Sequence, residues 1–205
     1  MYQAGIDEAG RGSVLGPIVM AIVVAGPKGR RNLKSIGVRD SKLLRPKKRK
    51  ALFLKISGGK SGTSYASWVL QPPSVIDSMN LNKLEMMMCL NLIKSVDCMD
   101  EIEFIVDDFT DGGWKKLGLP SHVRFEPKAD TKYVVVGAAS ILAKVVRDHL
   151  MMKALEQEGG PKCSGYPSDP KTINYLREYN KQHGKFPPST RLSWATCKRI
   201  IKEGK

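Results

Sequence analysis

The apolar segment PIVMAIVVAG, at residues 17–26, most limits what this chain can fold into. It carries no charge and is rich in valine and isoleucine, so it predicts a strand buried in a protein core. The charge-free stretch around it, between Arg11 and Lys28, is too short to span a membrane and contains glycine and proline. Acidic residues precede this stretch where a signal peptide would be basic, so we expect no signal peptide.

The remaining segments alternate between strand and helix patterns. A short first strand lies within QAGIDEAGRG, residues 3–12, and ends in a glycine-rich turn. Three more strands are predicted, in TSYASWVLQPP (63–73), EIEFIVDD (101–108) and VRFEPKAD (123–130). Helices are predicted from a capping box formed by Asn82 and Glu85, and over residues 137–157, 170–183 and 192–203. This order predicts an α/β core at residues 1–157 and a C-terminal helical appendage at residues 158–205.

The charge of the chain favours a polyanionic partner. Its net charge is +14, and the tract from Lys28 to Lys60 holds thirteen Lys or Arg residues against one acid, Asp40. A solvent-exposed face made of loops and helices is the other interpretation of this tract. The four cysteines form no CxxC pair, so we expect reduced thiols in a cytoplasmic protein.

Four acids stand at the ends of predicted elements. Asp7 and Glu8 end the first strand, Asp107 ends the strand at 101–108, and Asp130 precedes the long helix. Because strand ends are where α/β proteins bind ligands, these carboxylates can meet at one rim, where a cation would offset their repulsion. Oxygen ligands alone suit Mg²⁺ or Mn²⁺, and such a cluster beside a basic surface is typical of two-metal phosphodiester hydrolysis. Alternatively, each acid is a helix cap or a surface charge.

Several segments together resemble one known family. GIDEAGRGSVLGP at residues 5–17 resembles the opening signature of ribonuclease HII, the type 2 ribonuclease H family. The same resemblance extends to RDSKLL (39–44), KADTKYVVVGAASILAKVVRD (128–148), SGYPSDPKT (164–172) and RLSWATCKRI (191–200). The chain is similar in length to the compact archaeal form, and because its first strand starts at about residue 3 we expect no N-terminal domain of the ribonuclease HIII type.

The resemblance implies a ribonuclease H-like fold, a mixed five-stranded sheet flanked by helices, and a metal-dependent endonuclease using Mg²⁺ or Mn²⁺. The implied substrates are RNA–DNA hybrids and duplex DNA with single embedded ribonucleotides. Cleavage on the 5′ side of the ribonucleotide would leave 3′-hydroxyl and 5′-phosphate ends. The implied catalytic and metal-binding residues are Asp7, Glu8, Asp107 and Asp130. Asp107 is chosen over Asp108 because it follows the apolar strand directly, and Asp108 then points to the opposite side.

The resemblance also implies substrate-binding residues. Gly10, Arg11 and Gly12 match the family's GRG loop, whose backbone can approach a 2′-hydroxyl closely. Tyr166 matches the family tyrosine that stacks on a neighbouring sugar. Phosphate contacts are expected from Lys42 and, less strongly, from Lys144 and Arg147. We expect a monomer, and nothing in the sequence supports a sliding-clamp partner. Two alternatives stay open: a non-catalytic nucleic-acid-binding protein, and another nuclease of the same fold such as a junction resolvase.

Overall fold

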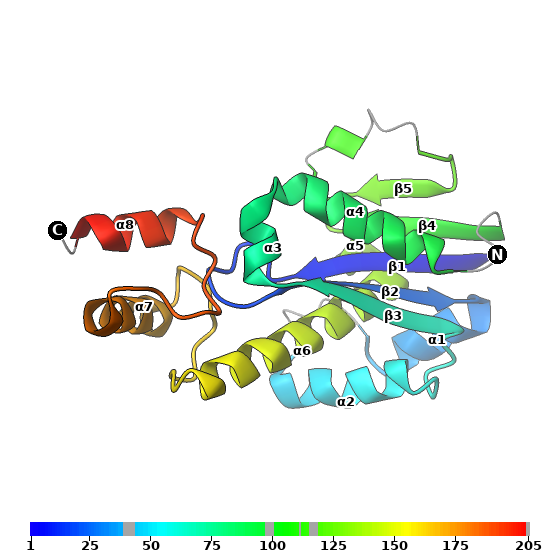
Figure 1. Cartoon of the computed structure of the whole chain (residues 1–205). Helices are drawn as coiled ribbons and strands as arrows, with labels where there is room; N and C mark the ends of the chain where they lie inside the picture. Colours follow the sequence, from blue (N-terminus) through cyan, green and yellow to red (C-terminus); the bar gives the residue numbers. More distant parts are fainter. Residues whose placement is uncertain (39–43, 97–100, 111, 115–118, 204–205) are drawn as a thin grey trace. The chain divides into compact units, whose positions relative to one another are not determined.

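The computed structural model describes residues 1–38, 44–96, 101–110, 112–114 and 119–203 (Figure 1). These residues form two compact units. The sheet unit comprises Met1–Ala9, Val19–Val69 and Asn82–Val145, and the helical unit comprises Gly10–Ile18, Leu70–Leu81 and Val146–Lys205. The sequence predicted a single boundary between residues 157 and 158. In the structure, the helical unit also includes the loop after the first strand and the second half of the long helix.

The sheet unit is built on a mixed five-stranded sheet, as predicted. Its strands lie in the order β3-β2-β1-β4-β5, with β1 antiparallel to β2 and parallel to β4, and with β4 parallel to β5. All eight residues of β2 are buried, which explains its continuous apolar sequence. The bounds are β1 Tyr2–Ala9, β2 Ile18–Ala25, β3 Tyr65–Gln71, β4 Ile102–Asp107 and β5 Val123–Glu126.

Eight helices are found in the described residues: α1 Pro27–Ser35, α2 Pro46–Ser57, α3 Pro73–Ser78, α4 Leu81–Lys94, α5 Ala129–Lys132, α6 Val134–Gln157, α7 Pro170–His183 and α8 Ala195–Glu203. Proline opens α1, α2 and α7, where its missing N–H costs nothing. The capping box predicted at Asn82 is wrong, because α4 begins at Leu81 and Asn82 lies inside its first turn. None of the described helices is long and apolar enough to cross a membrane.

Helices cover both faces of the sheet, with α4 on one side and α2 and the first half of α6 on the other (Figure 1). The close approach of α6 depends on Gly5 in β1. A Cβ atom at Gly5 would overlap the backbone of Val135 and Val136 and would lie 2.6 Å from the Val135 carbonyl oxygen. Side chains alternate along a strand, so Asp7 faces the same side as Gly5, toward α6.

The helical unit has its own apolar core. Leu15, Met151, Leu155, Leu176 and Ile200 are buried in one cluster that joins the loop after β1 to α6, α7 and α8. Asp169 caps α7 by accepting a hydrogen bond from the Lys171 N–H at 3.0 Å, as its sequence predicts. These contacts give the loops of this unit a packed base.

Candidate active site

The strand pairing brings Asp7 and Asp107 to the same edge of the sheet. β1 and β4 are parallel neighbours, and their register places Ile6 opposite Val106, one residue before each aspartate. Both side chains therefore lie near the carboxyl ends of adjacent strands, where α/β sheets bind ligands. Asp130 comes to this region in the short helix α5, which follows β5.

The electrostatics of Asp7 show that the four predicted acids are close together. Asp7 is buried, and this burial raises its pKa well above the usual value. The carboxylates of Glu8, Asp107 and Asp130 each raise the pKa of Asp7 further, whereas a hydrogen bond from Ser140 in α6 lowers it. The site therefore concentrates negative charge around one buried carboxyl group.

Backbone hydrogen bonds orient two of these carboxylates. The Glu8 N–H donates to Asp7 Oδ1 at 2.7 Å, and the Ala129 N–H donates to Asp107 Oδ1 at 2.7 Å. The second bond ties the end of β4 to the first residue of α5. Lys128 enters this helix with a φ of 57°, in the left-handed region. The turn therefore fixes Asp107 and Asp130 on adjoining elements.

Asp108 has a different environment from Asp107. Its Oδ1 accepts hydrogen bonds from the Thr110 N–H at 2.8 Å and the Thr110 hydroxyl at 2.7 Å, and its Oδ2 accepts from the Gly112 N–H at 3.1 Å. Asp108 thus stabilises its own loop. This placement supports the choice of Asp107 over Asp108 as the member of the cluster.

The carboxylates fit a hard divalent cation by donor type. Oxygen is the ligand that Mg²⁺ and Mn²⁺ prefer, and a bound cation would relieve the repulsion that acts on Asp7. Within the described residues, no three His, Cys, Asp or Glu side chains form a ready-made metal-binding group. Two observations therefore support a bound cation: the oxygen donors of the four acids, and the repulsion of Asp7 by the neighbouring carboxylates.

The loop with the predicted GRG motif belongs to the helical unit. Gly10 has a φ of +94°, and a Cβ atom there would lie 2.7 Å from the Pro17 carbonyl oxygen, so the fold itself requires glycine. Gly12 differs, because a Cβ atom there would meet nothing within 4 Å. The Arg11 carbonyl accepts a hydrogen bond from Arg191 Nη1 at 3.0 Å, which holds the backbone of the motif.

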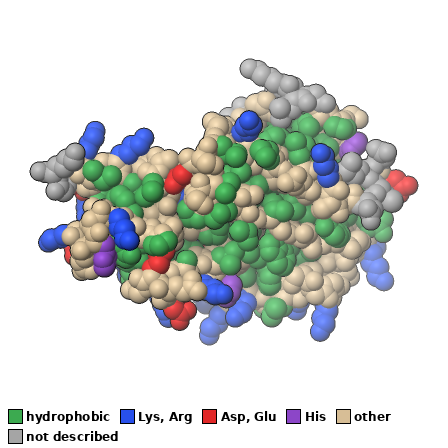
Figure 2. All heavy atoms as spheres, viewed as in Figure 1, with side chains coloured by type: hydrophobic (Ala, Val, Ile, Leu, Met, Phe, Trp, Pro, Cys, Tyr) green, Lys and Arg blue, Asp and Glu red, His purple; other side chains and the backbone are tan. Residues whose placement is uncertain are grey.

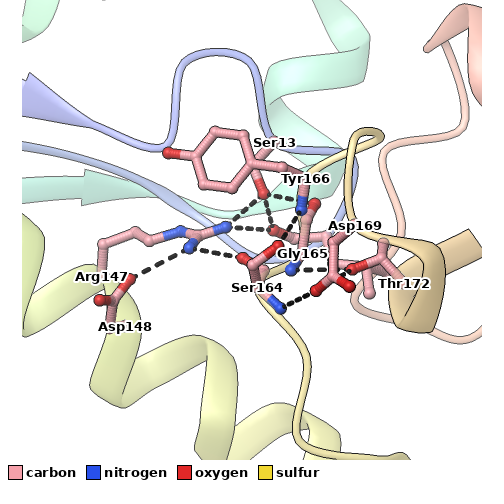
Figure 3. Close-up of polar contacts among 9 residues, drawn as sticks. Ser13, Arg147, Asp148, Ser164, Gly165, Tyr166, Asp169 and Thr172 are labelled. Carbon is pink, nitrogen blue, oxygen red and sulfur yellow. Dashed lines mark hydrogen bonds and ion pairs between the residues drawn. The ribbon is translucent and has the colours of Figure 1, made fainter.

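Tyr166 stands on a second loop of the helical unit, with its ring over Arg147 (Figure 3). The guanidinium carbon lies 4.9 Å from the ring centroid. Two hydrogen bonds attach this loop to the start of α7. Asp169 Oδ2 accepts from the Ser164 N–H at 2.7 Å, and Thr172 Oγ1 accepts from the Gly165 N–H at 3.0 Å. Tyr166 itself is partly exposed.

Of the three residues predicted to contact phosphate, the two that the structure describes have different environments. Arg147 is fully buried, so its prediction as a phosphate contact is wrong; its head group binds protein loops. Lys144 is partly exposed, and Lys42 lies outside the described residues. The described part of the basic tract includes α1 and α2. On the face shown in Figure 2, hydrophobic side chains gather over the middle of the sheet unit, and Lys and Arg lie mainly at its margin.

Sequence reasoning missed three supporting residues. Ser140 hydrogen-bonds to Asp7, and Arg191 is fully buried, with Nε donating to the Gly16 carbonyl oxygen at 3.0 Å. Ser13 is also buried and donates to the Gly165 carbonyl oxygen at 2.9 Å. Each lies within a segment that resembles the family, which is the signal that could have found it.

Known proteins resemble this chain over almost its whole length. The family model described as "Ribonuclease HII" matches residues 4–197. Ribonuclease HII of Pyrococcus furiosus is 41% identical, over 98% of this chain and 91% of the relative. The crystal structure of the ribonuclease H2 from Pyrococcus horikoshii matches with a TM-score of 0.84 and 38% identity, covering 99% of this chain and 98% of the other.

A second solved structure, of a PCNA:RNase HII complex from Archaeoglobus fulgidus, matches with a TM-score of 0.79 and 31% identity, covering 97% of this chain and 96% of that chain. The family match spans nearly the whole chain, and the fold of the P. horikoshii enzyme agrees with the mixed sheet described above. The chain therefore belongs to the ribonuclease HII family, and it is a metal-dependent endoribonuclease that cuts the RNA strand of RNA–DNA hybrids.

Proposed function

We propose that this enzyme also incises duplex DNA on the 5′ side of a single embedded ribonucleotide, leaving 3′-hydroxyl and 5′-phosphate ends by two-metal hydrolysis. Asp7, Glu8, Asp107 and Asp130 would hold the ions, which are Mg²⁺ or Mn²⁺. The observation that carries the proposal is the crowding of three carboxylates around the buried Asp7, which is unfavourable unless a cation is bound there.

Bound divalent ions would supply a hydroxide nucleophile and stabilise the leaving oxygen of the cleaved phosphodiester. The protein's part is to hold the oxygen ligands at the end of a rigid sheet. Asp7 and Asp107 sit on hydrogen-bonded neighbouring strands, and the backbone bond from Ala129 restrains Asp107. The hydrogen bond from Ser140 favours the ionised form of Asp7, which is the form that binds a metal.

Recognition of the ribonucleotide is assigned to the loop of Gly10, Arg11 and Gly12 and to Tyr166. Gly12 supports this assignment, since the fold has room for a side chain there and an approaching sugar would not. The partly exposed Tyr166 ring can stack on a deoxyribose, where a 2′-hydroxyl would be left unsatisfied. A preference for an RNA-to-DNA junction follows from such a contact.

The basic tract, including Lys42, is proposed to contact phosphates of the nucleic acid. The sheet unit would then act as the catalytic core and the helical unit as the substrate-binding appendage. We propose a monomer as the active form. A sliding-clamp partner is supported only by the complex of the A. fulgidus relative, so it is not part of the proposal.

The test is a duplex of DNA with one ribonucleotide, labelled at its 5′ end and incubated with EDTA, Mg²⁺ or Mn²⁺. We expect one cut on the 5′ side of the ribonucleotide in the presence of metal and none in EDTA. Binding without cleavage under every condition would favour a non-catalytic nucleic-acid-binding protein. Cleavage of a branched duplex made only of DNA would favour a junction resolvase.

A further inference from the structure

Arg147 is a charged side chain buried at a place where packing alone would favour an apolar residue. It lies in α6 with no exposed surface, one helical turn before the buried Met151. Removing a guanidinium group from water is costly unless its hydrogen bonds and charge are satisfied. Its only described ion pair is with the adjacent Asp148, at 3.1 Å from Nη1. A buried arginine here therefore needs a reason beyond filling space.

The head group of Arg147 joins the two loops assigned to recognition. Nη1 donates to the Ser164 carbonyl oxygen at 2.9 Å, on the loop that carries Tyr166. Nη2 donates to the Leu15 carbonyl oxygen at 3.2 Å and to the Ser13 hydroxyl, on the loop that carries the GRG motif (Figure 3). Because a guanidinium is planar, these bonds fix the two loops relative to each other within the helical unit.

The two glycines nearest to Arg147 show how closely the loops fit around it. Gly165 has a φ of +78°, and a Cβ atom there would lie 2.9 Å from Arg147 Nη2 and would overlap the Met151 sulfur atom. A Cβ atom at Gly10 would lie 3.2 Å from Arg147 Cγ and 3.3 Å from its Nε. Arg147 thus occupies the space that a side chain at either of these two glycines would need.

The same guanidinium also supports the ring of Tyr166. With 4.9 Å between the guanidinium carbon and the ring centroid, the cation lies against one face of the ring. Only the opposite face and the edges remain available to a substrate. We propose that Arg147 is a positioning residue for ribonucleotide recognition: it holds the Tyr166 ring and the GRG loop in one fixed arrangement without itself touching nucleic acid.

This inference rests on the proposed recognition role of Tyr166. It also predicts that variants of Arg147 and Tyr166 affect each other, which does not follow from the role of Tyr166 alone. The effects of Arg147→Lys and Tyr166→Ala on substrate preference should be less than additive, because part of the first effect acts through the Tyr166 ring. Arg191→Lys is the matched control. Arg191 is equally buried in the same unit and supports the Arg11 and Gly16 carbonyl oxygens, but its guanidinium stacks on Trp194 at 5.0 Å instead of Tyr166.

The assay measures kcat/KM on duplex DNA with one ribonucleotide and on an all-RNA hybrid, for each single variant and both double variants. Arg147→Lys should reduce the ratio of the two values about tenfold, and adding it to Tyr166→Ala should reduce the ratio by clearly less than tenfold. Arg191→Lys weakens the hold on the Arg11 carbonyl oxygen and not on the Tyr166 ring, so its effect on the ratio should add to that of Tyr166→Ala. Independent, additive effects of Arg147→Lys and Tyr166→Ala would overturn the inference, as would a loss in Arg147→Lys that is uniform across substrates and matches a lower melting temperature.

A substrate-free measurement separates failure of this inference from failure of the proposed function. Fluorine NMR on protein containing 3-fluorotyrosine reports six tyrosines, with the Tyr166 signal assigned by Tyr166→Phe. Arg147→Lys should shift the Tyr166 signal more than Arg191→Lys does, because Arg147 lies over the Tyr166 ring whereas Arg191 lies over Trp194. An unmoved signal overturns the inference, whereas a shifted signal with no effect of Tyr166→Ala on substrate ratio overturns the recognition role. If Arg147→Lys does not fold, Ser13→Ala takes its place, since it removes one of the bonds made by Arg147.

Discussion

Replacing the two glycines of the GRG motif by alanine should separate folding from recognition. Gly10→Ala places a side chain at a φ of +94°, where non-glycine residues are strained by about 1–2 kcal/mol. The new methyl group would also lie 2.7 Å from the Pro17 carbonyl oxygen, and such crowding costs about 1–3 kcal/mol more. The free energy of unfolding should therefore fall by about 2–5 kcal/mol, which lowers the melting temperature by about 4–20 °C.

Gly12→Ala should behave in the opposite way. Its methyl group would meet nothing within 4 Å, and Gly12 is not among the glycines with positive φ. Alanine at a compatible position stabilises by about 0.4–1 kcal/mol, because it restricts the unfolded chain. The melting temperature should stay level or rise by up to about 4 °C. Cleavage at a single ribonucleotide should nevertheless fall by about tenfold or more, because the methyl group would occupy the space of the approaching sugar.

The assay pairs a thermal melt followed by circular dichroism with initial rates on 5′-labelled duplex containing one ribonucleotide. Rates are measured well below the melting temperature of each variant, so that unfolding does not contribute. Normal cleavage by Gly12→Ala would refute the close approach of substrate to this residue. A melting temperature of Gly12→Ala as low as that of Gly10→Ala would contradict the open space around Gly12.

Three other predictions concern charge. Asp107→Asn should reduce cleavage by more than about 100-fold, because a neutral amide holds a divalent ion poorly. Asp108→Asn should mainly lower the melting temperature, since Asp108 accepts three loop hydrogen bonds. A larger loss of cleavage rate in Asp108→Asn than in Asp107→Asn would show that Asp108 is the metal ligand. The raised pKa of Asp7 means that the folded state binds a proton more readily than the unfolded state, so in EDTA the stability should fall as pH rises through that pKa, and Asp7→Asn should flatten this slope in pH-dependent melts. Affinity for a hybrid should fall with salt by a log–log slope of about −0.9 per phosphate contacted, and an unchanged slope in Lys42→Ala would remove Lys42 from the contact surface.

The sequence allowed the sheet to be predicted for a physical reason. Strand side chains alternate with a period of two and β2 is apolar throughout, so the strand segments stood out before their pairing was known. The position of Asp7 and Asp107 at strand ends was predictable for the same reason. The pairing of β1 with β4 is a contact between segments about 100 residues apart in the sequence, and no local pattern encodes it.

The residues that support the site were harder to predict, because the local sequence pattern suggests an environment that differs from the one in the structure. An arginine on a helix usually indicates a solvent-exposed position, and Arg147 is buried only because two distant loops supply carbonyl oxygens to it. Similarly, glycine in a strand suggests a bulge or a close approach without naming the partner, so Gly5 gave no hint of α6. The compact helical unit includes the loop after β1, whose Ser13 bonds to Gly165 more than 130 residues later in the chain, and no local pattern encodes such a contact.

The parallel pairing of β1 with β4 has a consequence for how the enzyme matures. Asp7 and Asp107 become neighbours only when strands near the start and the middle of the chain close a loop of about 100 residues. A chain still emerging during synthesis, or a fragment that ends before β4, has the acids of β1 but not their partner. With Asp7 and Asp107 proposed as metal ligands, the proposed metal site is complete only after β4 has paired with β1.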